Sequence, residues 1–182
     1  MQSCRMDLRL ARPGDERVVA GIHVRSWQEA YAGLLPASVL NALDPAQRAT
    51  RYTFGDENTA TVLAVDDGRV CGFATHGAAR DPDAARCGEL LSIYLDPAWV
   101  GQGIGRILIA DARARLSART FAEAVLWVLV GNTRATRFYE LDGWRPDGSQ
   151  RPIDLHGAIV DEVRYRRSLA GPGSSISTLG VR

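Results

Sequence analysis

The chain has 182 residues, of which 46% are hydrophobic and 24% charged, close to average globular usage. We expect one domain with a core of its own over residues 1–170, and a flexible Gly- and Ser-rich tail over 171–182. The formal net charge is +1 and basic residues are interspersed with acidic ones, so nucleic acid is not an expected partner. All 22 basic residues are Arg, which excludes a catalytic lysine and a Walker phosphate loop.

The three cysteines, Cys4, Cys71 and Cys87, show neither CxxC spacing nor a His at metal-ligand spacing. We therefore expect no metal site, and buried free thiols at Cys71 and Cys87. The N-terminus lacks an apolar signal core, and no stretch is long and apolar enough for a membrane span. These features predict a cytoplasmic protein without membrane contact, and they leave a homodimer open.

Apolar periodicity and turn residues predict the elements of the first half. A helix is expected between Asp15, which is a suitable cap residue, and Gly33, which can close it. Two short helical stretches follow, the second opened by Asp44-Pro45. The strands of this half cover residues 6–10, 61–65 and 70–75, and the last two form an antiparallel hairpin.

The second half alternates strands and helices. A strand over 89–95 ends at Asp96-Pro97, and an amphipathic helix covers 104–116. The apolar run 124–130 is typical of a central strand that is covered on both faces. The remaining elements are a helix at 133–141, a turn at 146–149 and final strands at 153–155 and 160–166. Together the elements predict an α/β fold, a mixed sheet with helices on its faces.

A glycine loop, Gly101-Gln102-Gly103-Ile104-Gly105, lies between the strand at 89–95 and the helix that follows it. Unblocked backbone N–H groups and the positive end of a helix dipole meet there, so the loop suits a phosphate or pyrophosphate. A merely tight turn is the alternative reading. A dinucleotide site is excluded, because the third glycine of G-x-G-x-x-G would fall on Arg106 or Leu108.

Two segments resemble the signatures of the GCN5-related N-acetyltransferase (GNAT) family. Residues 89–105 are similar to its fourth strand and acetyl-CoA loop, of consensus Q/R-x-x-G-x-G/A, and residues 132–144 are similar to N-x-x-A-x-x-F-Y-x-x-x-G-F/W. The segments stand in the family's order. The resemblance implies a central mixed, mostly antiparallel sheet splayed at strands 4 and 5, acetyl-CoA as cosubstrate, and direct transfer of an acetyl group to an amine.

One residue departs from the family pattern, because Val100 stands where the family usually has Gln or Arg. Backbone amides remain to hold the pyrophosphate, and Gln102 or Arg106 can compensate for the missing polar side chain. Asn132 would bond the pantetheine arm, cap the next helix, or do both. Carried over by position, the resemblance places acetyl-CoA against Ile93, Leu95, Val100, Gly101, Gln102, Gly103, Ile104, Gly105, Arg106 and Asn132.

The resemblance also implies catalytic groups. A free N–H of Ile93 would stabilise the oxyanion, and Tyr139 matches the tyrosine that protonates the thiolate of coenzyme A. Otherwise Tyr139 is a core aromatic residue. Glu89 matches a glutamate that serves as base, often through water, in some members and is structural in others. His76, on a strand that by topology faces the same cleft, is the alternative base and a third candidate for the acceptor site.

The acceptor amine would lie near the first two helices, where Trp27 and Tyr31 are candidate lining residues. Packing of the same helix face on the sheet explains Trp27 equally well. The sequence leaves a small-molecule amine and a peptide or protein amine open as acceptors. It also leaves open a protein that binds acetyl-CoA as a sensor without transferring the acetyl group.

Overall fold

The computed structural model describes residues 6–170, so Cys4 and the predicted tail at 171–182 lie outside the described residues. Most predicted elements are present, with bounds that differ by a few residues. In chain order the elements are β1 (Asp7–Leu10), α1 (Glu16–Ala30), α2 (Ala37–Asn41), α3 (Pro45–Ala49), β2 (Thr59–Asp66), β3 (Arg69–Ala78), the short 3-10 helix η1 (Pro82–Ala84), β4 (Gly88–Leu95), the 3-10 helix η2 (Pro97–Trp99), α4 (Ile104–Ala118), β5 (Glu123–Leu129), α5 (Thr133–Leu141), β6 (Arg145–Leu155) and β7 (Ala158–Ser168).

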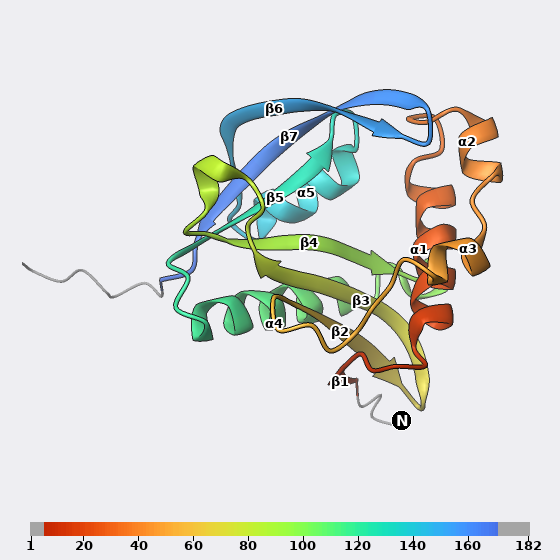
Figure 1. Cartoon of the computed structure of the whole chain (residues 1–182), viewed down its shortest axis with the longest axis horizontal. Coiled ribbons are helices and arrows are strands. Elements are labelled where there is room, and N and C mark those ends of the chain that lie inside the picture. Colours follow the sequence, from red (N-terminus) through yellow and green to blue (C-terminus); the bar gives the residue numbers. More distant parts are fainter. Residues whose placement is uncertain (1–5, 171–182) are drawn as a thin grey trace, which may run out of the picture.

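The seven described strands form one sheet with the order β1-β2-β3-β4-β5-β7-β6. β4 and β5 pair in parallel, and the other neighbouring strands pair in antiparallel fashion. Figure 1 shows β4 and β5 side by side at one end and far apart at the other. The predicted fold, a mixed and mostly antiparallel sheet that opens between its fourth and fifth strands, is confirmed.

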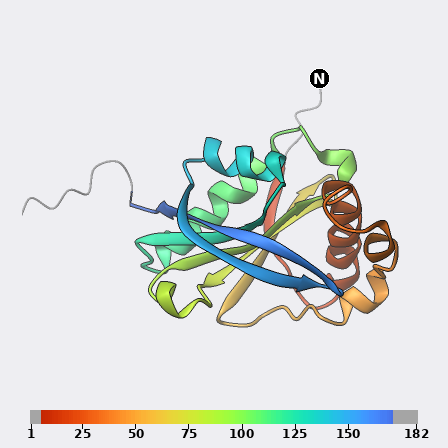
Figure 2. The same ribbon diagram turned by 90° about the horizontal axis from the view of Figure 1, so that it is seen from above.

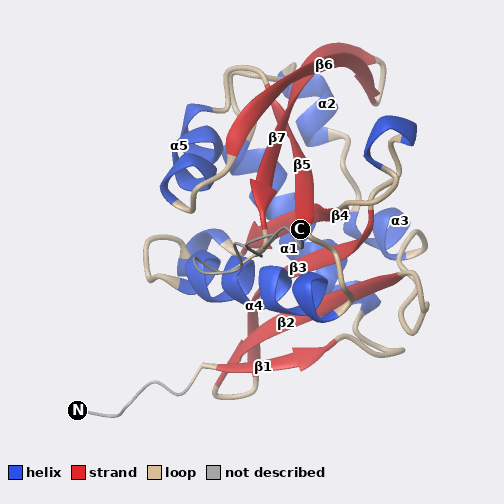
Figure 3. Ribbon diagram, turned by 90° about the vertical axis from the view of Figure 1, so that its left-hand side faces the viewer, coloured by secondary structure: helices blue, strands red, loops and turns tan. Residues whose placement is uncertain are grey.

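Helices cover both faces of the sheet (Figures 2 and 3). In Figure 3, α4 lies in front of β2 and β3, whereas α1 lies behind the sheet. Successive residues of β2 point to opposite faces, so Val62 and Ala64 pack in the cluster of α4, and Leu63 packs with Val19 and Ile22 of α1. The sheet therefore has an α4 face and an α1 face, and both are buried.

The apolar run of β5 is covered on both faces, as predicted. Leu126 and Val128 belong to the cluster of α4, whereas Val125 is fully buried on the other face beside Cys87. Cys71 and Cys87 are buried free thiols, which also confirms the prediction for them. Among residues 6–170 no helix has the length and apolar character needed to cross a bilayer.

Asp15 occupies the cap position of α1 but does not cap the helix with its side chain, which corrects the prediction. Its carboxylate accepts hydrogen bonds from both Nη atoms of Arg9, at 2.7 and 2.8 Å, and from the backbone N–H of Arg12 at 2.9 Å. A charged guanidinium on β1 competes successfully with the helix amides for this carboxylate. The residue therefore joins β1 to α1.

Residues 146–149 form part of β6 and not the predicted turn. The register on β7 runs from Pro146, opposite Tyr165, to Gln150, opposite Val163, so three residues of β6 face one of β7. This bulge continues the strand because β7 supplies a partner on both sides of it. The turn residues of this segment therefore shape a bend inside a long hairpin.

Candidate functional site

A second irregularity lies in β4, at the place where this strand leaves β5. Leu90 stands opposite His76 and Ser92 stands opposite Thr75, so Leu91 is an extra residue in β4. Pairing between β4 and β5 is limited to two positions, Gly88↔Ala124 and Glu89↔Val125. The bulge and the divergence of the strands together open the sheet from Leu90 onward.

The divergence leaves backbone donors of β4 without a neighbouring strand. The N–H of Asp96 donates to the carbonyl of Cys71 at 2.9 Å, on the β3 side. N–H groups alternate along a strand, so those of Leu95 and Ile93 face the other side, toward the gap. Ile93 and Leu95 thus have the geometry that the sequence-based prediction requires of them.

A cavity of about 530 Å³ fills the gap between β4 and β5. This volume is in the range of small-molecule and cofactor sites. Its walls come from α1, β4, the glycine loop, α4, β5 and α5. The lining residues are Ser26, Ala30, Tyr31, Leu90, Leu91, Ser92, Ile93, Tyr94, Leu95, Val100, Gly101, Gly103, Gly105, Arg106, Trp127, Val128, Asn132, Arg134, Ala135, Phe138 and Tyr139.

The glycine loop forms one end of this cavity and leads into the 15-residue helix α4. Gly101 and Gly103 have φ of +85° and +83°, a conformation that glycine adopts without strain, and the space beside both is open. Within the described chain, the N–H groups of Gly101, Gln102 and Gly103 donate no backbone hydrogen bond. Free amides at a helix N-terminus suit an anion.

The side chains around the loop divide into those that reach the cavity and those that do not. Arg106 lines the cavity, as does Val100. The side chain of Gln102 instead donates to the carbonyl of Ala98 at 3.1 Å, and that of Ile104 is buried in the core. Of the two residues considered as substitutes for a polar side chain at position 100, the geometry favours Arg106.

The N-terminal cap and the last turn of α5 contribute two cavity residues of the second signature. Asn132 lines the cavity and caps α5, because its Oδ1 accepts the N–H of Ala135 at 3.1 Å. Tyr139 also lines the cavity, and its hydroxyl makes no hydrogen bond with residues 6–170. Burial, and secondarily the nearby Tyr94, raise the pKa of the Tyr139 phenol, so it keeps its proton at neutral pH.

The side of the cavity that faces α1 is aromatic. Tyr31, the residue that follows α1, and Tyr94 of β4 line it, and burial raises the pKa of both phenols. Trp27 does not line this cavity: it is 7% exposed, packs in the core with Leu129, and stands edge-on to Tyr31 at 5.0 Å between ring centroids. Of the acceptor-site candidates Trp27 and Tyr31, only Tyr31 reaches the cavity.

Glu89 and His76 are both buried outside the set of lining residues. The carboxylate of Glu89 is held by Arg80, whose Nη2 donates to it at 2.8 Å. Burial lowers the pKa of His76 to about 4, with Arg115 of α4 as a further cause. His76 therefore lies toward α4, and the topology that placed it at the cleft in the sequence-based prediction is wrong.

Trp127 is a lining residue that sequence reasoning missed. It lies in the apolar run of β5, where strand alternation puts Trp127 on the face opposite Leu126. Its indole N–H donates to Asp81 at 2.8 Å, and the guanidinium of Arg151 stacks 3.9 Å from the ring centroid. The sequence did contain a signal for Trp127, because it is a large aromatic residue in a strand that ends at a glycine. Such a residue is a candidate for the wall of a site at that end of the strand.

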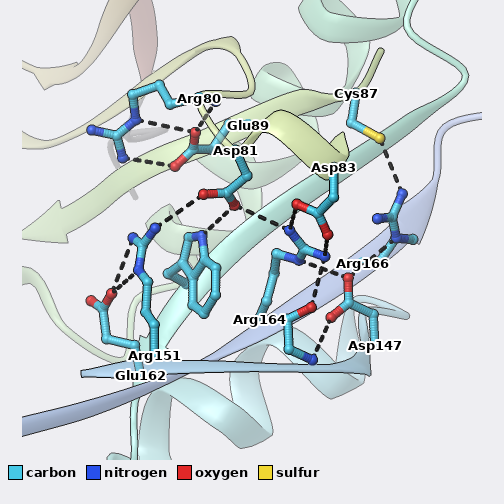
Figure 4. Close-up of polar contacts among 12 residues, drawn as sticks. Arg80, Asp81, Asp83, Cys87, Glu89, Asp147, Arg151, Glu162, Arg164 and Arg166 are labelled. Atoms are coloured by element: carbon cyan, nitrogen blue, oxygen red, sulfur yellow. Dashed lines mark hydrogen bonds and ion pairs between the residues drawn. The ribbon is translucent and has the colours of Figure 1, made fainter. Parts of the chain in front are cut away.

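A polar cluster surrounds Trp127 and ties the β3–β4 loop to the last hairpin (Figure 4). Arg164, which is 3% exposed, pairs with Asp81, Asp83 and Asp147 at 3.2, 2.6 and 2.8 Å. The hydrogen bonds to Asp83 and the other carboxylates raise the pKa of Arg164. Within residues 6–170 no group of three or more His, Cys, Asp or Glu is placed to hold a metal ion.

Comparison with known proteins agrees with this geometry. Residues 22–144 match the model of the acetyltransferase (GNAT) family. The chain is 30% identical over 125 residues to the uncharacterized N-acetyltransferase YuaI of Bacillus subtilis (strain 168), covering 69% of this chain and 72% of the relative. It is 29% identical over 93 residues to the aminoglycoside N(6')-acetyltransferase type 1 of Stenotrophomonas maltophilia, covering 49% and 58%.

The fold is also that of solved structures. The PaiA N-acetyltransferase of Thermoplasma acidophilum, solved in complex with coenzyme A, superposes with a TM-score of 0.70 at 17% identity, covering 90% of this chain and 99% of that one. The family match spans both signatures and the opened sheet between them. The chain therefore belongs to the acetyltransferase (GNAT) family and is an N-acetyltransferase.

Proposed function

We propose that the protein transfers the acetyl group of acetyl-CoA to a primary amine, by direct attack in a ternary complex. The observation that supports this most is the continuous cavity between β4 and β5, which joins the glycine loop to Tyr139 and Tyr31. The pyrophosphate would lie at the glycine loop, the amine near Tyr31, and the thioester between them.

The residues of the cavity suit acetyl-CoA in two places. The amides of Gly101 to Gly105 and the guanidinium of Arg106 would hold the pyrophosphate at the N-terminus of α4. Amide groups of β4 and the side chain of Asn132 would bond the pantetheine arm. Acetyl-CoA would supply the activated thioester, and the residues of this chain would orient it.

Two groups of the chain would serve the chemical step. The N–H of Ile93, aimed into the gap, would donate to the thioester oxygen as negative charge develops on it. The hydroxyl of Tyr139, which is protonated at neutral pH, would donate its proton to the departing sulfur. Glu89, the base that the sequence suggested, would act only if its carboxylate left Arg80.

Thiol release tests this function. The purified protein is incubated with acetyl-CoA and a panel of primary amines: benzylamine, kanamycin, because one relative bears the name of an aminoglycoside acetyltransferase, and a peptide with a free N-terminus. We expect thiol release that depends on the amine, and an acetylated product by mass spectrometry. Turnover of the peptide alone would assign a protein amine as acceptor.

A sensor without transfer activity is the alternative, and one observation favours it: no carboxylate stands among the lining residues found within residues 6–170. The same assay separates the two functions. Tight binding of acetyl-CoA, measured by calorimetry, with no thiol release on any amine of the panel would support the sensor and reject the transferase.

A further inference from the structure

Figure 4 shows two glutamates, Glu89 on β4 and Glu162 on β7. They differ in how many of their carboxylate oxygens accept hydrogen bonds. Glu89 is 2% exposed and both of its oxygens are engaged by Arg80. Nη2 donates to Oε1 at 2.8 Å, whereas Nε and the backbone N–H donate to Oε2 at 3.2 and 3.1 Å. Both oxygens of Glu89 are therefore occupied by Arg80, and neither is free to contact a molecule in the cavity.

Glu162 keeps one oxygen free. Its Oε2 accepts from Nε and Nη2 of Arg151, at 3.3 and 3.2 Å. Its Oε1 accepts no hydrogen bond from residues 6–170, and it is not one of the fully buried atoms that lack a partner. The side chain is 13% exposed, so Oε1 is open to water or to a ligand.

The register of the sheet places Glu162, which is not itself a lining residue, next to residues of the aromatic side of the cavity. Glu162 stands opposite Leu129 of β5, and cross-strand partners project from the same face. Leu129 packs with Tyr31 and Tyr94, which line the cavity. Trp127, two residues before Leu129 on that same face, lines it as well.

Electrostatics supports this placement. Burial raises the pKa of Tyr31 and Tyr94, and the negative charge of Glu162 adds to the rise in both. Burial also raises the pKa of Glu162, whereas Arg151 and Arg80 lower it and Glu89 raises it. A carboxylate whose pKa is raised and that lies beside a substrate cavity is suited to act as a general base.

We propose that Glu162 is the carboxylate that takes the proton of the acceptor ammonium, directly or through one water molecule, and that Glu89 is held by Arg80 as a structural anchor. The proposal rests on the proposed transferase function. It names the acceptor as a primary amine that arrives protonated, with its ammonium beside Glu162, Tyr31 and Tyr94.

The proton balance follows from this assignment. An N–H bond of the ammonium breaks and an O–H bond forms on Glu162, which leaves a neutral amine to attack the thioester carbon. The C–N bond forms and the C–S bond breaks, and Tyr139 gives its proton to the sulfur. The nitrogen then loses a second proton to solvent, which reprotonates Tyr139, and Glu162 releases the first, so one proton is set free in each turnover.

Matched substitutions test the proposal, with benzylamine and kanamycin as probes. Glu162→Gln should lower kcat by about 10²-fold or more at pH 7, and its remaining rate should rise steeply toward pH 9 as the amine deprotonates in solution. Glu162→Asp should restore part of kcat. Glu123→Gln alters a glutamate that is also paired with an arginine but lies at the opposite end of β5 from Leu129, and it should behave as the wild type.

The affinity for acetyl-CoA and the Tm of each variant separate a chemical role from a structural one. Glu162→Gln should keep the wild-type affinity for acetyl-CoA, whereas Glu89→Gln should mainly lower the Tm. A Glu162→Gln variant with the kcat and pH profile of the wild type would overturn the proposal. So would a loss of kcat in Glu89→Gln that exceeds the loss in Glu162→Gln.

Absence of turnover with every amine would reject the transferase function. A binding measurement tests the role of Glu162 in that case as well. Benzylammonium is titrated by calorimetry into the complex of the protein with coenzyme A. Binding to Glu162→Gln should be at least about tenfold weaker than to the wild type, as expected for a lost charge contact. Equal affinities, or no binding to either, would contradict the proposal.

Discussion

The indole nitrogen of Trp127 donates a hydrogen bond to a carboxylate oxygen of Asp81, 2.8 Å away. This bond joins a wall of the cavity to the β3–β4 loop, because Trp127 lines the cavity and Asp81 precedes η1. Asp81 is in turn paired with Arg151 at 3.1 Å and Arg164 at 3.2 Å. The orientation of one aromatic wall is thus fixed by residues from the loop and from β6 and β7.

Replacing Asp81 by Ala should weaken the acceptor side of the site. The change removes the bond to Trp127 and one partner of the buried Arg164, at a cost of about 1 to 3 kcal/mol in the free energy of unfolding. We expect a higher KM for the amine and an unchanged Kd for acetyl-CoA.

Asp83→Ala is the matched control, because Asp83 pairs with Arg164 but not with Trp127. It should lower stability without changing the KM for the amine. Steady-state kinetics and urea unfolding of both variants give the comparison. Equal KM values for the Asp81 variant and the wild type would show that Trp127 needs no support from the loop.

Replacing Tyr139 by Phe should lower kcat by about 10²-fold or more and leave the Kd for acetyl-CoA near the wild-type value, since the hydroxyl would act mainly in the transition state. Tyr165→Phe is the control. Its hydroxyl donates to Glu140 at 3.2 Å and neither residue lines the cavity, so the variant should keep its kcat. An unchanged kcat in Tyr139→Phe would remove Tyr139 as the acid.

Replacing Gly103 by Asp should abolish binding of acetyl-CoA. The position has φ of +83° and open space beside it, so the new side chain would place bulk and negative charge where the pyrophosphate is expected. Gly68→Asp carries the same change at a hairpin glycine with φ of +77°, and it should retain binding. Calorimetry with acetyl-CoA decides, and binding by the Gly103 variant would reject the loop as the anion site.

Two buried histidines should make the protein less stable in mild acid. Burial lowers the pKa of His23 to about 3 and of His76 to about 4. Below the ordinary His pKa of about 6.5 the unfolded chain binds protons that the folded chain does not, so the free energy of unfolding falls as the pH drops. Each histidine contributes at most about 1.4 kcal/mol per pH unit in this range.

His76→Leu tests the contribution of one group. Neither ring nitrogen of His76 has a hydrogen-bond partner within the described chain, so the substitution removes a titrating group without breaking a bond. Urea unfolding at pH 7, 6 and 5 should give a shallower pH dependence than in the wild type. A slope for His76→Leu equal to that of the wild type would contradict the expectation.

The local sequence pattern predicted a helix or strand correctly where the pattern of that segment alone determines its structure. The run of β5 was identified because apolar residues on both faces require cover on both faces, and α5 has the predicted bounds. Asp15 and the bend in β6 were misread for a common reason. In both cases the partner lies on another strand. The carboxylate of Asp15 binds Arg9 of β1, and the residues of the bend continue β6 because they lie beside β7.

The sequence by itself determined the family, the order of strands and helices, and the glycine loop, because these depend on residue spacing along the chain. The tertiary structure decided which side chains share the cavity. Tyr31 and Trp127 line the cavity, whereas Trp27 and His76 are buried away from it. The carboxylate of Glu89 is paired with Arg80. Such choices depend on strand register and on charged partners distant in sequence, which no local pattern records.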